Sequence, residues 1–350
     1  MATDSRDVEQ KLDDALLAVL PDGGNVVSVT PSGMSEYVHT YRIQVSMPDG
    51  SSQVFFQKEA TGSNGYELME AAFISESTAH EFIPEFLPKP VTMGTYKSRP
   101  NVHFFLSEFV ELIEDDIPDP EDYMAPIIAL HMRSMGRSPY GPHQWGFSNN
   151  TRFGDLEQPN EFKGSWEEFW TGQMKMFLDR EEERRGPPDA EYAKLRPLFF
   201  EKVLPRYLRP LETGGRSITP TLIHGDLWPG NVRYKTDDTV CAYDSCVLWG
   251  HNEVDLGVFR NPRYPLGKAY LKEYWKHVPI SEPEEDADSR NNLYMLRNQI
   301  LLAILYPHDH KLREVFVSNM KLLVHRVLAE EAAAKGSAES LGGPGLQAHL

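Results

Sequence analysis

The sequence predicts an α+β protein of two lobes, a β-rich amino-terminal lobe and a mainly helical carboxy-terminal lobe. The chain has 350 residues, which is more than one small core requires. Residues 25–108 contain several strand-like runs around a single helical one, whereas residues 113–330 are dominated by apolar residues at helical spacing. We expect the first lobe to span residues 1–107, a hinge 108–112, and the second lobe 113–330.

The first lobe is expected to contain two helices and a sheet. Apolar residues recur at helical spacing in residues 8–20, and Pro21 ends that helix. A second helix is predicted over residues 66–81. Pro48-Asp49-Gly50 is a typical hairpin turn between two strands. The strands are expected at residues 25–30, 37–47, 53–58, 91–94 and 102–108.

The second lobe is expected to be helical apart from a Gly- and Asn-rich loop at residues 136–164. Its helical segments are predicted at residues 123–135, 165–183, 191–207, 255–274 and 288–330. Residues 331–350 are rich in Ala, Gly and Ser and offer little apolar surface to bury, which predicts a disordered tail.

Charge and cysteine content exclude several classes of function. The formal net charge of −17 argues against nucleic acid or an anionic membrane as the main partner. The chain has two cysteines, Cys241 and Cys246, which form neither a zinc motif nor a disulfide framework. The amino terminus is unlike a targeting peptide, and no apolar run approaches the roughly 20 residues that span a bilayer. We therefore expect a cytoplasmic protein.

The most informative segment is His224-Gly225-Asp226-Leu227-Trp228-Pro229-Gly230-Asn231. It has the H-x-D-x-x-x-x-N spacing of a phosphoryl-transfer loop, in which the aspartate orients a substrate hydroxyl and the asparagine holds a metal ion against nucleotide phosphates. A second metal-binding aspartate should follow from a nearby strand, and Asp244 follows the β-like run 240–243. The alternative is a polar turn between two strands.

These motifs resemble those of the fructosamine-3-kinase (ketosamine-3-kinase) family. The family carries HGDLW-x-GN, then a metal aspartate and a GH-x-E-x-DL signature, which this chain matches at residues 224–231, 244 and 250–256. Further matches occur at Trp145-Gly146-Phe147 and Trp166-Glu167-Glu168-Phe169, so the resemblance extends over roughly residues 25–328. It implies a protein-kinase-like fold, close to that of the aminoglycoside phosphotransferases.

The resemblance implies a set of nucleotide-binding residues. Lys58, at the end of the third strand, corresponds to the lysine that pairs with the α- and β-phosphates; the alternative is an exposed edge-strand lysine. Gly33 is the one glycine of the loop expected to cover the nucleotide, residues 30–35. Glu108 and Val110 occupy the hinge positions whose backbone C=O and N–H contact adenine.

The resemblance also assigns the catalytic and metal-binding positions. Asp226 is expected to be the catalytic carboxylate, with Asn231 and Asp244 as Mg²⁺ ligands. Trp228 is either a wall of the sugar pocket or a buried residue beneath the loop. Asp255 is expected to organise the segment after the metal site or to cap the next helix.

Two departures from the family concern the nucleotide site. The helix residue expected to pair with Lys58 aligns with Ala72, where the family usually has glutamate. Glu76 lies one turn further along the same face and is expected to substitute for it, whereas Glu70 lies nearly opposite. Ser245 replaces the proline that usually follows the metal aspartate.

The resemblance implies an ATP- and Mg²⁺-dependent kinase that phosphorylates a sugar hydroxyl of ketosamines on protein lysines or small amines, which allows deglycation. Two alternatives remain open. One is a kinase for another hydroxyl, on an aminoglycoside, choline or an amino-alcohol, since an acidic surface suits a cationic acceptor. The other is a nucleotide-binding pseudokinase that acts as a scaffold, which Ala72 favours.

Overall fold

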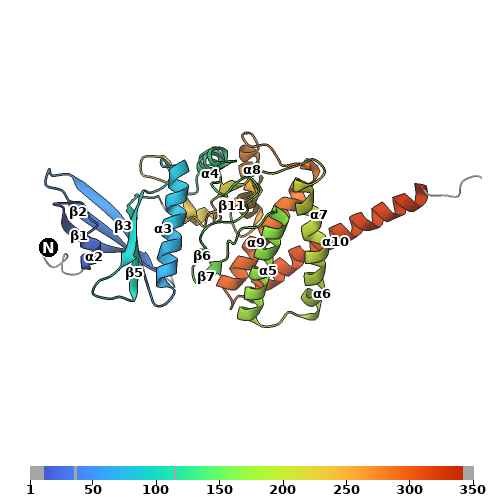
Figure 1. Ribbon diagram of the computed structural model, residues 1–350, viewed down its shortest axis with the longest axis horizontal. Coiled ribbons are helices and arrows are strands. Elements are labelled where there is room, and N and C mark those ends of the chain that lie inside the picture. The colour runs from blue at the N-terminus through green and yellow to red at the C-terminus, as the bar shows by residue number, and fades with distance from the viewer. Residues whose placement is uncertain (1–11, 35–37, 114–115, 342–350) are drawn as a thin grey trace, which may run out of the picture. The chain divides into compact units, whose positions relative to one another are not determined.

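The computed structural model describes residues 12–34, 38–113 and 116–341 (Figure 1). Their contacts divide into two compact units. The first unit comprises the described residues of Met1–Gly164, Thr219–Asp255 and Pro262–Pro279, and the second those of Ser165–Ile218, Leu256–Asn261 and Ile280–Leu350. All residues expected to bind nucleotide, metal or acceptor belong to the first unit.

A five-stranded antiparallel sheet forms the amino-terminal part of the first unit, in the order β1-β2-β3-β5-β4. Its strands are β1 (Asn25–Met34), β2 (His39–Ser46), β3 (Ser52–Thr61), β4 (Pro90–Thr95) and β5 (Val102–Glu108), which confirms the five predicted strands. The predicted hairpin turn joins β2 to β3, where Gly50 has a φ of 85° and Asp49 Oδ1 accepts the Ser51 N–H at 2.9 Å.

Apolar side chains cover both faces of this sheet. Successive strand residues point to opposite faces, so Phe104 and Leu106 join one cluster with the short helix α2 (Asp14–Leu17), while Phe105 joins another. In the second cluster Phe105 packs with Met69 of α3 (Gly65–Phe82), the helix beside the sheet in Figure 1. The predicted helix 66–81 is thereby confirmed, and residues 8–11 of the first predicted helix lie outside the described residues.

The rest of the first unit places short strands next to the expected catalytic loop. Strand β8 (Thr221–Ile223) pairs with β11 (Leu248–Gly250) and leads into residue 224; β10 (Val240–Ala242) pairs with β9 (Val232–Tyr234) and leads to Asp244. The predicted helix 123–135 appears as α4 (Pro120–Ser134). The predicted loop 136–164 contains a small hairpin, β6 (Thr151–Phe153) and β7 (Leu156–Gln158), whose turn contains Gly154 at a φ of 59°.

The predicted helical segment 255–274 is interrupted. A 3₁₀ stretch covers Asn252–Arg260, and α8 spans only Lys268–Tyr274. Pro262 and Pro265 lie between them, and proline lacks the N–H that would continue the helical hydrogen bonds.

The second unit is helical. Its elements are α5 (Trp166–Arg185), α6 (Ala190–Leu198), a π-helical turn (Phe199–Val203), α7 (Leu204–Leu208), two 3₁₀ turns (Arg209–Glu212 and Glu284–Asp286), α9 (Ala287–Leu305) and α10 (His310–Leu341). Trp166 anchors α5 to α9 because its Nε1–H donates to the Tyr294 hydroxyl at 2.9 Å. α10 continues through residues 331–341, where the sequence predicted a tail; alanine, glutamate and lysine there favour a helix.

No helix within the described ranges is long and apolar enough to cross a membrane.

A buried ion-pair cluster connects the helices of the second unit. The carboxylate of Glu181 on α5 is fully buried and accepts two hydrogen bonds from Arg313 on α10, at 2.7 and 2.8 Å. The Arg185 guanidinium lies 3.6 Å from the same carboxylate, and its side chain is 3% exposed. One carboxylate therefore balances two arginines in this interior.

Replacing Glu181 by alanine should lower the free energy of unfolding by about 3–5 kcal/mol, because the two arginines would lose their buried counter-charge. Urea denaturation followed by circular dichroism measures the loss. Glu183→Ala is the matched control: Glu183 lies on the same helix, is 60% exposed and pairs with Arg180, so its loss should stay below about 1 kcal/mol. Equal losses in the two variants would contradict the importance of this cluster.

Candidate active site

The first unit contains a cleft of about 600 Å³ that brings several predicted site residues together. Its walls come from β1, β2 and β3, from α3, from β5 with the segment that follows it, and from the residues after β10. The lining includes Thr30, Pro31, Ser32, Lys58, Glu76, Glu108, Val110, Tyr243 and Asp244.

At one end of the cleft, Lys58 forms an ion pair with Asp244. β3 carries Lys58, and Asp244 follows β10 in the left-handed backbone region, with a φ of 58°. Burial alone would lower the pKa of Lys58, but the Asp244 carboxylate raises it above its ordinary value, so the ammonium group stays charged. The Asp244 side chain is 45% exposed and remains accessible from the cleft. Lys58 is therefore an inward-facing lysine and not an exposed edge-strand residue.

Glu76 of α3 is the glutamate that faces this pair. It is buried, and its Oε1 accepts the Ser245 N–H at 2.8 Å and the Ser245 hydroxyl at 3.2 Å. Burial and the neighbouring Asp244 carboxylate raise the pKa of Glu76 to about 7, against the opposing effect of Lys58. Proline has no N–H, so serine at position 245 supplies a donor that the usual family residue lacks.

Ala72 lies elsewhere on α3. It packs against the apolar cluster of Ala60, Met69 and Phe105, whereas Glu76 lines the cleft. Glu76, one helical turn further along, binds Ser245, while Lys58 pairs with Asp244, so the expected pairing of Glu76 with Lys58 is not seen.

Asp226 and Asn231 are held together within the predicted catalytic loop. The Asn231 Nδ2 donates to the backbone oxygen of Asp226 at 2.9 Å and to its carboxylate Oδ2 at 3.1 Å. Because both bonds use the amide nitrogen, the Asn231 Oδ1 is available as a metal ligand. Asn231 O also accepts the Tyr243 N–H at 3.0 Å, which ties the loop to the residue before Asp244.

A carboxylate from further along the chain holds the backbone that precedes Asp226. Asp255 accepts the His224 N–H on Oδ2 at 2.7 Å and the Gly225 N–H on Oδ1 at 2.8 Å. Gly225 has a φ of 83°, and a Cβ there would lie 2.4 Å from the Cys246 backbone oxygen, so no other residue fits. Asp255 therefore organises the catalytic loop, and its two oxygens are directed at that loop and not at a helix terminus.

The other members of this buried network escaped the sequence analysis. His131, Tyr274 and Asn252 connect to Asp255 from α4, α8 and the 3₁₀ stretch. His131 and Tyr274 lie far from Asp255 in the sequence and outside any motif, and Asn252 falls at an unspecified position of the GH-x-E-x-DL signature.

Trp228 lies at the surface of the loop. Its side chain is 41% exposed, and its ring centroid is 6.3 Å from that of Tyr264. A Cβ at Gly230 would come within 2.0 Å of the Trp228 ring, so glycine there leaves room for the indole. The exposure of Trp228 contradicts the alternative of a buried packing residue, and Trp228 is not among the residues that line the cleft.

The predicted nucleotide-covering loop is described only in part. Gly33 has a φ of 145°, and its backbone oxygen accepts the Thr40 hydroxyl at 2.9 Å, which holds the ends of β1 and β2 together. Ser35, the last residue of the predicted loop, lies outside the described residues.

The oxygen atoms near Asp244 suit a hard cation that is bound partly by the protein and partly by phosphate. Within the described ranges, no group of three or more His, Cys, Asp or Glu side chains could enclose a metal ion. Asn231 and Asp244 together offer an amide oxygen and a carboxylate. Mg²⁺ is usually held in this way, by one or two protein oxygens together with substrate phosphates and water.

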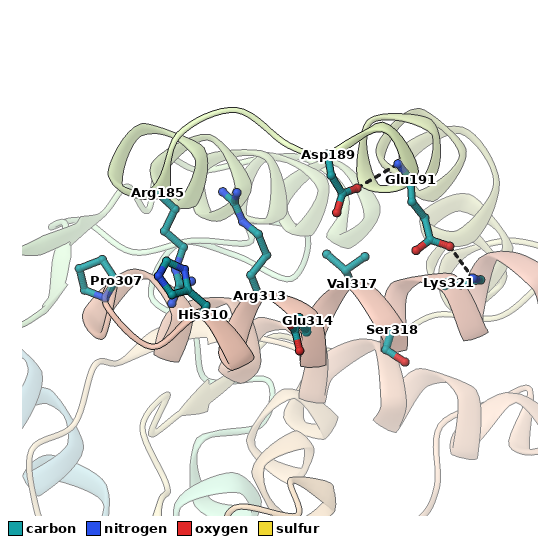
Figure 2. Close-up of a pocket in the computed structure, with 10 residues that line it drawn as sticks. All are labelled: Arg185, Asp189, Glu191, Pro307, His310, Arg313, Glu314, Val317, Ser318 and Lys321. Carbon is teal, nitrogen blue, oxygen red and sulfur yellow. Dashed lines mark hydrogen bonds and ion pairs between the residues drawn. The ribbon is translucent and has the colours of Figure 1, made fainter.

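A second cavity, of about 390 Å³, lies in the second unit between the α5–α6 connection and α10 (Figure 2). Several of its charged side chains have protein partners: Glu191 pairs with Lys321, Asp189 caps α6, and Arg313 pairs with Glu181. None of the predicted site residues lines it, so the cleft of the first unit remains the candidate site.

Comparisons with known proteins agree with this geometry. The fructosamine kinase family model matches residues 33–329. A chloroplastic protein-ribulosamine 3-kinase of Arabidopsis thaliana is 25% identical over 165 residues, 47% of this chain and 46% of that protein. A probable ketoamine kinase of Enterococcus faecium is 26% identical over 69% of this chain and 77% of its own length. The chain thus spans about half the length of the first of these relatives and about three quarters of the second.

Solved structures share the fold. A protein of Haemophilus somnus assigned as a fructosamine-3-kinase matches with a TM-score of 0.66 and 17% identity, over 92% of this chain and 98% of that one. Aminoglycoside phosphotransferase APH(4)-Ia matches with a TM-score of 0.57 and 12% identity, over 86% and 94%. The predicted kinase-like α+β fold is thereby confirmed. Since the family model matches most of the sequence, the chain belongs to the fructosamine kinase family.

Proposed function

We propose that this protein is an ATP-dependent kinase that phosphorylates a sugar hydroxyl of ketosamines, the fructosamine or ribulosamine adducts of protein lysines or small amines. The observation that carries the proposal is the convergence of Lys58, Glu76 and Asp244 on one cleft. The family match and the names of the curated relatives support the ketosamine class of acceptor. Phosphorylation would destabilise the adduct and allow deglycation.

In this proposal residues 1–107 form the nucleotide-binding lobe, residues 108–112 the hinge and residues 113–330 the catalytic lobe. ATP lies in the cleft, with adenine against the backbone of Glu108 and Val110, both of which line it. The phosphates extend toward Lys58 and the backbone around Gly33. Lys58 is paired with Asp244 in this structure. The phosphates of ATP would compete with the Asp244 carboxylate for the Lys58 ammonium group.

The chemistry requires little covalent participation by the protein. Asp226 accepts a hydrogen bond from the acceptor hydroxyl, and this bond aligns the hydroxyl oxygen with the γ-phosphorus. The Asp226 carboxylate receives the hydroxyl proton as the bond between the γ-phosphorus and ADP breaks. Asn231 fixes the Asp226 carboxylate by the bond from its Nδ2. Asn231 and Asp244 would hold Mg²⁺, which neutralises charge on the phosphates during transfer. The exposed ring of Trp228 would contact the sugar.

Two observations bear on the alternatives. The net charge of −17 also suits other cationic acceptors, so a kinase for an aminoglycoside or an amino-alcohol is the second candidate. Glu76 lines the cleft and Ala72 does not, which favours an active kinase over a scaffold.

ADP release by the purified protein tests the proposal. Mg²⁺-ATP is supplied with fructosyl-lysine and ribosyl-lysine as ketosamines, and with an aminoglycoside and choline as controls. Mass spectrometry of the products locates the transferred phosphate. Turnover with the ketosamines well above that with the controls supports the proposal, and turnover with the controls alone would replace it by the second candidate.

Asp226→Asn should lower kcat by about 10²–10⁴-fold, since general-base or orienting groups typically contribute that much. The substitution keeps the shape of the side chain, so ATP affinity should change little. Steady-state kinetics with the best ketosamine measures both quantities. A kcat close to that of the wild type would remove Asp226 from the proposed role.

Asp244→Ala should abolish the Mg²⁺-dependent part of nucleotide binding. Ligand that binds the native state raises stability by RT ln(1 + [L]/Kd), so melting temperatures with ATP, with and without Mg²⁺, report the binding. The wild type should show a larger shift with Mg²⁺ than without, and the variant an equal shift in both. A wild-type shift that ignores Mg²⁺ argues against metal-assisted ATP binding.

Glu76→Ala should lower kcat/KM by about 10- to 100-fold, because hydrogen bonds to charged groups contribute about 1.5–3 kcal/mol. Glu70→Ala on the same helix is the matched control and should have little effect, because Glu70 does not line the cleft. Ala72→Glu should not raise activity, since position 72 faces the apolar cluster. Improved activity in Ala72→Glu, with no loss in Glu76→Ala, would contradict the assignment of Glu76.

A further inference from the structure

A buried chain of hydrogen bonds lies behind the predicted catalytic loop and joins Asp255 of the GH-x-E-x-DL motif to His131 and Tyr274, which lie outside it. It joins four side chains, each with at most 5% of its surface exposed: His131, Asn252, Asp255 and Tyr274. They come from α4, from the 3₁₀ stretch Asn252–Arg260 and from α8.

The donors and acceptors of this chain follow one consistent order. Asn252 Nδ2 donates to the Tyr274 hydroxyl at 2.8 Å. Burial raises the pKa of Tyr274, so its hydroxyl keeps its proton and donates it to His131 Nδ1 at 2.7 Å. With Nδ1 accepting from Tyr274, the His131 imidazole donates its Nε2–H to Asp255 Oδ2 at 3.1 Å.

The order ends at the backbone that precedes the catalytic aspartate. Oδ2 of Asp255 accepts from both His131 and the His224 N–H, and Oδ1 accepts the Gly225 N–H. Burial would raise the pKa of Asp255, but the hydrogen bonds from His131 and Gly225 lower it below its ordinary value. The carboxylate therefore remains an acceptor with both oxygens in use.

Tight packing alone does not require this arrangement. Apolar side chains of similar volume would pack α4 against α8 without the cost of desolvating a carboxylate. Because the carboxylate is directed at the loop, its own orientation sets where the His224–Gly225 backbone lies. A donor that fixes the carboxylate then acts on the position of Asp226, the next residue.

We propose that His131 is a positioning residue for phosphoryl transfer: by donating to Asp255, it holds the carboxylate that fixes the backbone in front of Asp226. His131 touches neither nucleotide nor acceptor in this account and acts only through Asp255. The kinetic consequence rests on the proposed kinase function, whereas the structural consequence does not.

A matched pair of substitutions separates the two contacts of His131. In His131→Gln, the amide nitrogen reaches the position of Nε2 and keeps the donor to Asp255. In His131→Asn, the shorter amide reaches the position of Nδ1, keeps contact with Tyr274 and loses Asp255. Met132→Leu, at an exposed neighbouring position on α4, controls for general effects.

His131→Asn should lower kcat by about 10- to 100-fold with the KM for ATP unchanged, by analogy with the loss of residues that orient metal ligands. His131→Gln should stay close to the wild type. If the role of His131 were purely structural, both variants would lose stability. Their kcat and KM values would then not depend on which contact of His131 is kept. Equal kcat losses in the two variants would overturn the proposal.

Hydrogen exchange measured by mass spectrometry tests the proposal without any turnover. Exchange in a peptide covering residues 222–227 should become faster in His131→Asn and remain as in the wild type in His131→Gln. Faster exchange throughout α4 and α8, or no change at 222–227, would contradict it. If the wild type shows no acceptor-dependent turnover, the proposed kinase function fails, while the exchange result still decides the role of His131.

Discussion

The candidate site depends on one short segment, Asp244-Ser245-Cys246, which contacts β3, α3 and the start of the predicted catalytic loop. Asp244 pairs with Lys58 of β3, and the Ser245 N–H and hydroxyl bind Glu76 of α3. The Cys246 N–H donates to His224 O at 2.8 Å, at the start of the catalytic loop. The Lys58 ammonium group is largely buried, and an unpaired buried charge is costly, so its pairing with Asp244 is stabilising. The segment therefore fixes the lysine, the helix and the loop relative to one another.

The same logic applies to Glu76 of α3. Ser245 supplies the N–H and the hydroxyl that hold its buried carboxylate. A buried glutamate at position 76 without hydrogen-bond donors would be destabilising, so Glu76 depends on Ser245. On the other side of the loop, Asp255 fixes the backbone before Asp226. Asp226 is thus constrained from both sides, by the segment after β10 and by the buried network.

Much of this was accessible from sequence because the information is local. Strand alternation and the Pro48-Asp49-Gly50 turn predicted the sheet, and a fixed spacing predicted the loop that joins Asp226 to Asn231. How α3 packs depends on tertiary contacts, so the sequence alone could not show that Glu76 lines the cleft while Ala72 packs against an apolar cluster. The same applies to His131 and the exposure of Trp228: the contacts that define them join residues more than a hundred positions apart or depend on the surface that the fold creates.

The central claim is that the cleft holds Mg²⁺-nucleotide between Lys58 and Asp244. A crystal structure with Mg²⁺ and a non-hydrolysable ATP analogue tests it most directly. The account predicts phosphate oxygens within hydrogen-bond distance of Lys58 Nζ, and a metal ion bound by Asp244 and by Asn231 Oδ1, with Glu76 still bound to Ser245. Nucleotide bound outside this cleft, or bound within it without contact to Lys58 and Asp244, would contradict the account.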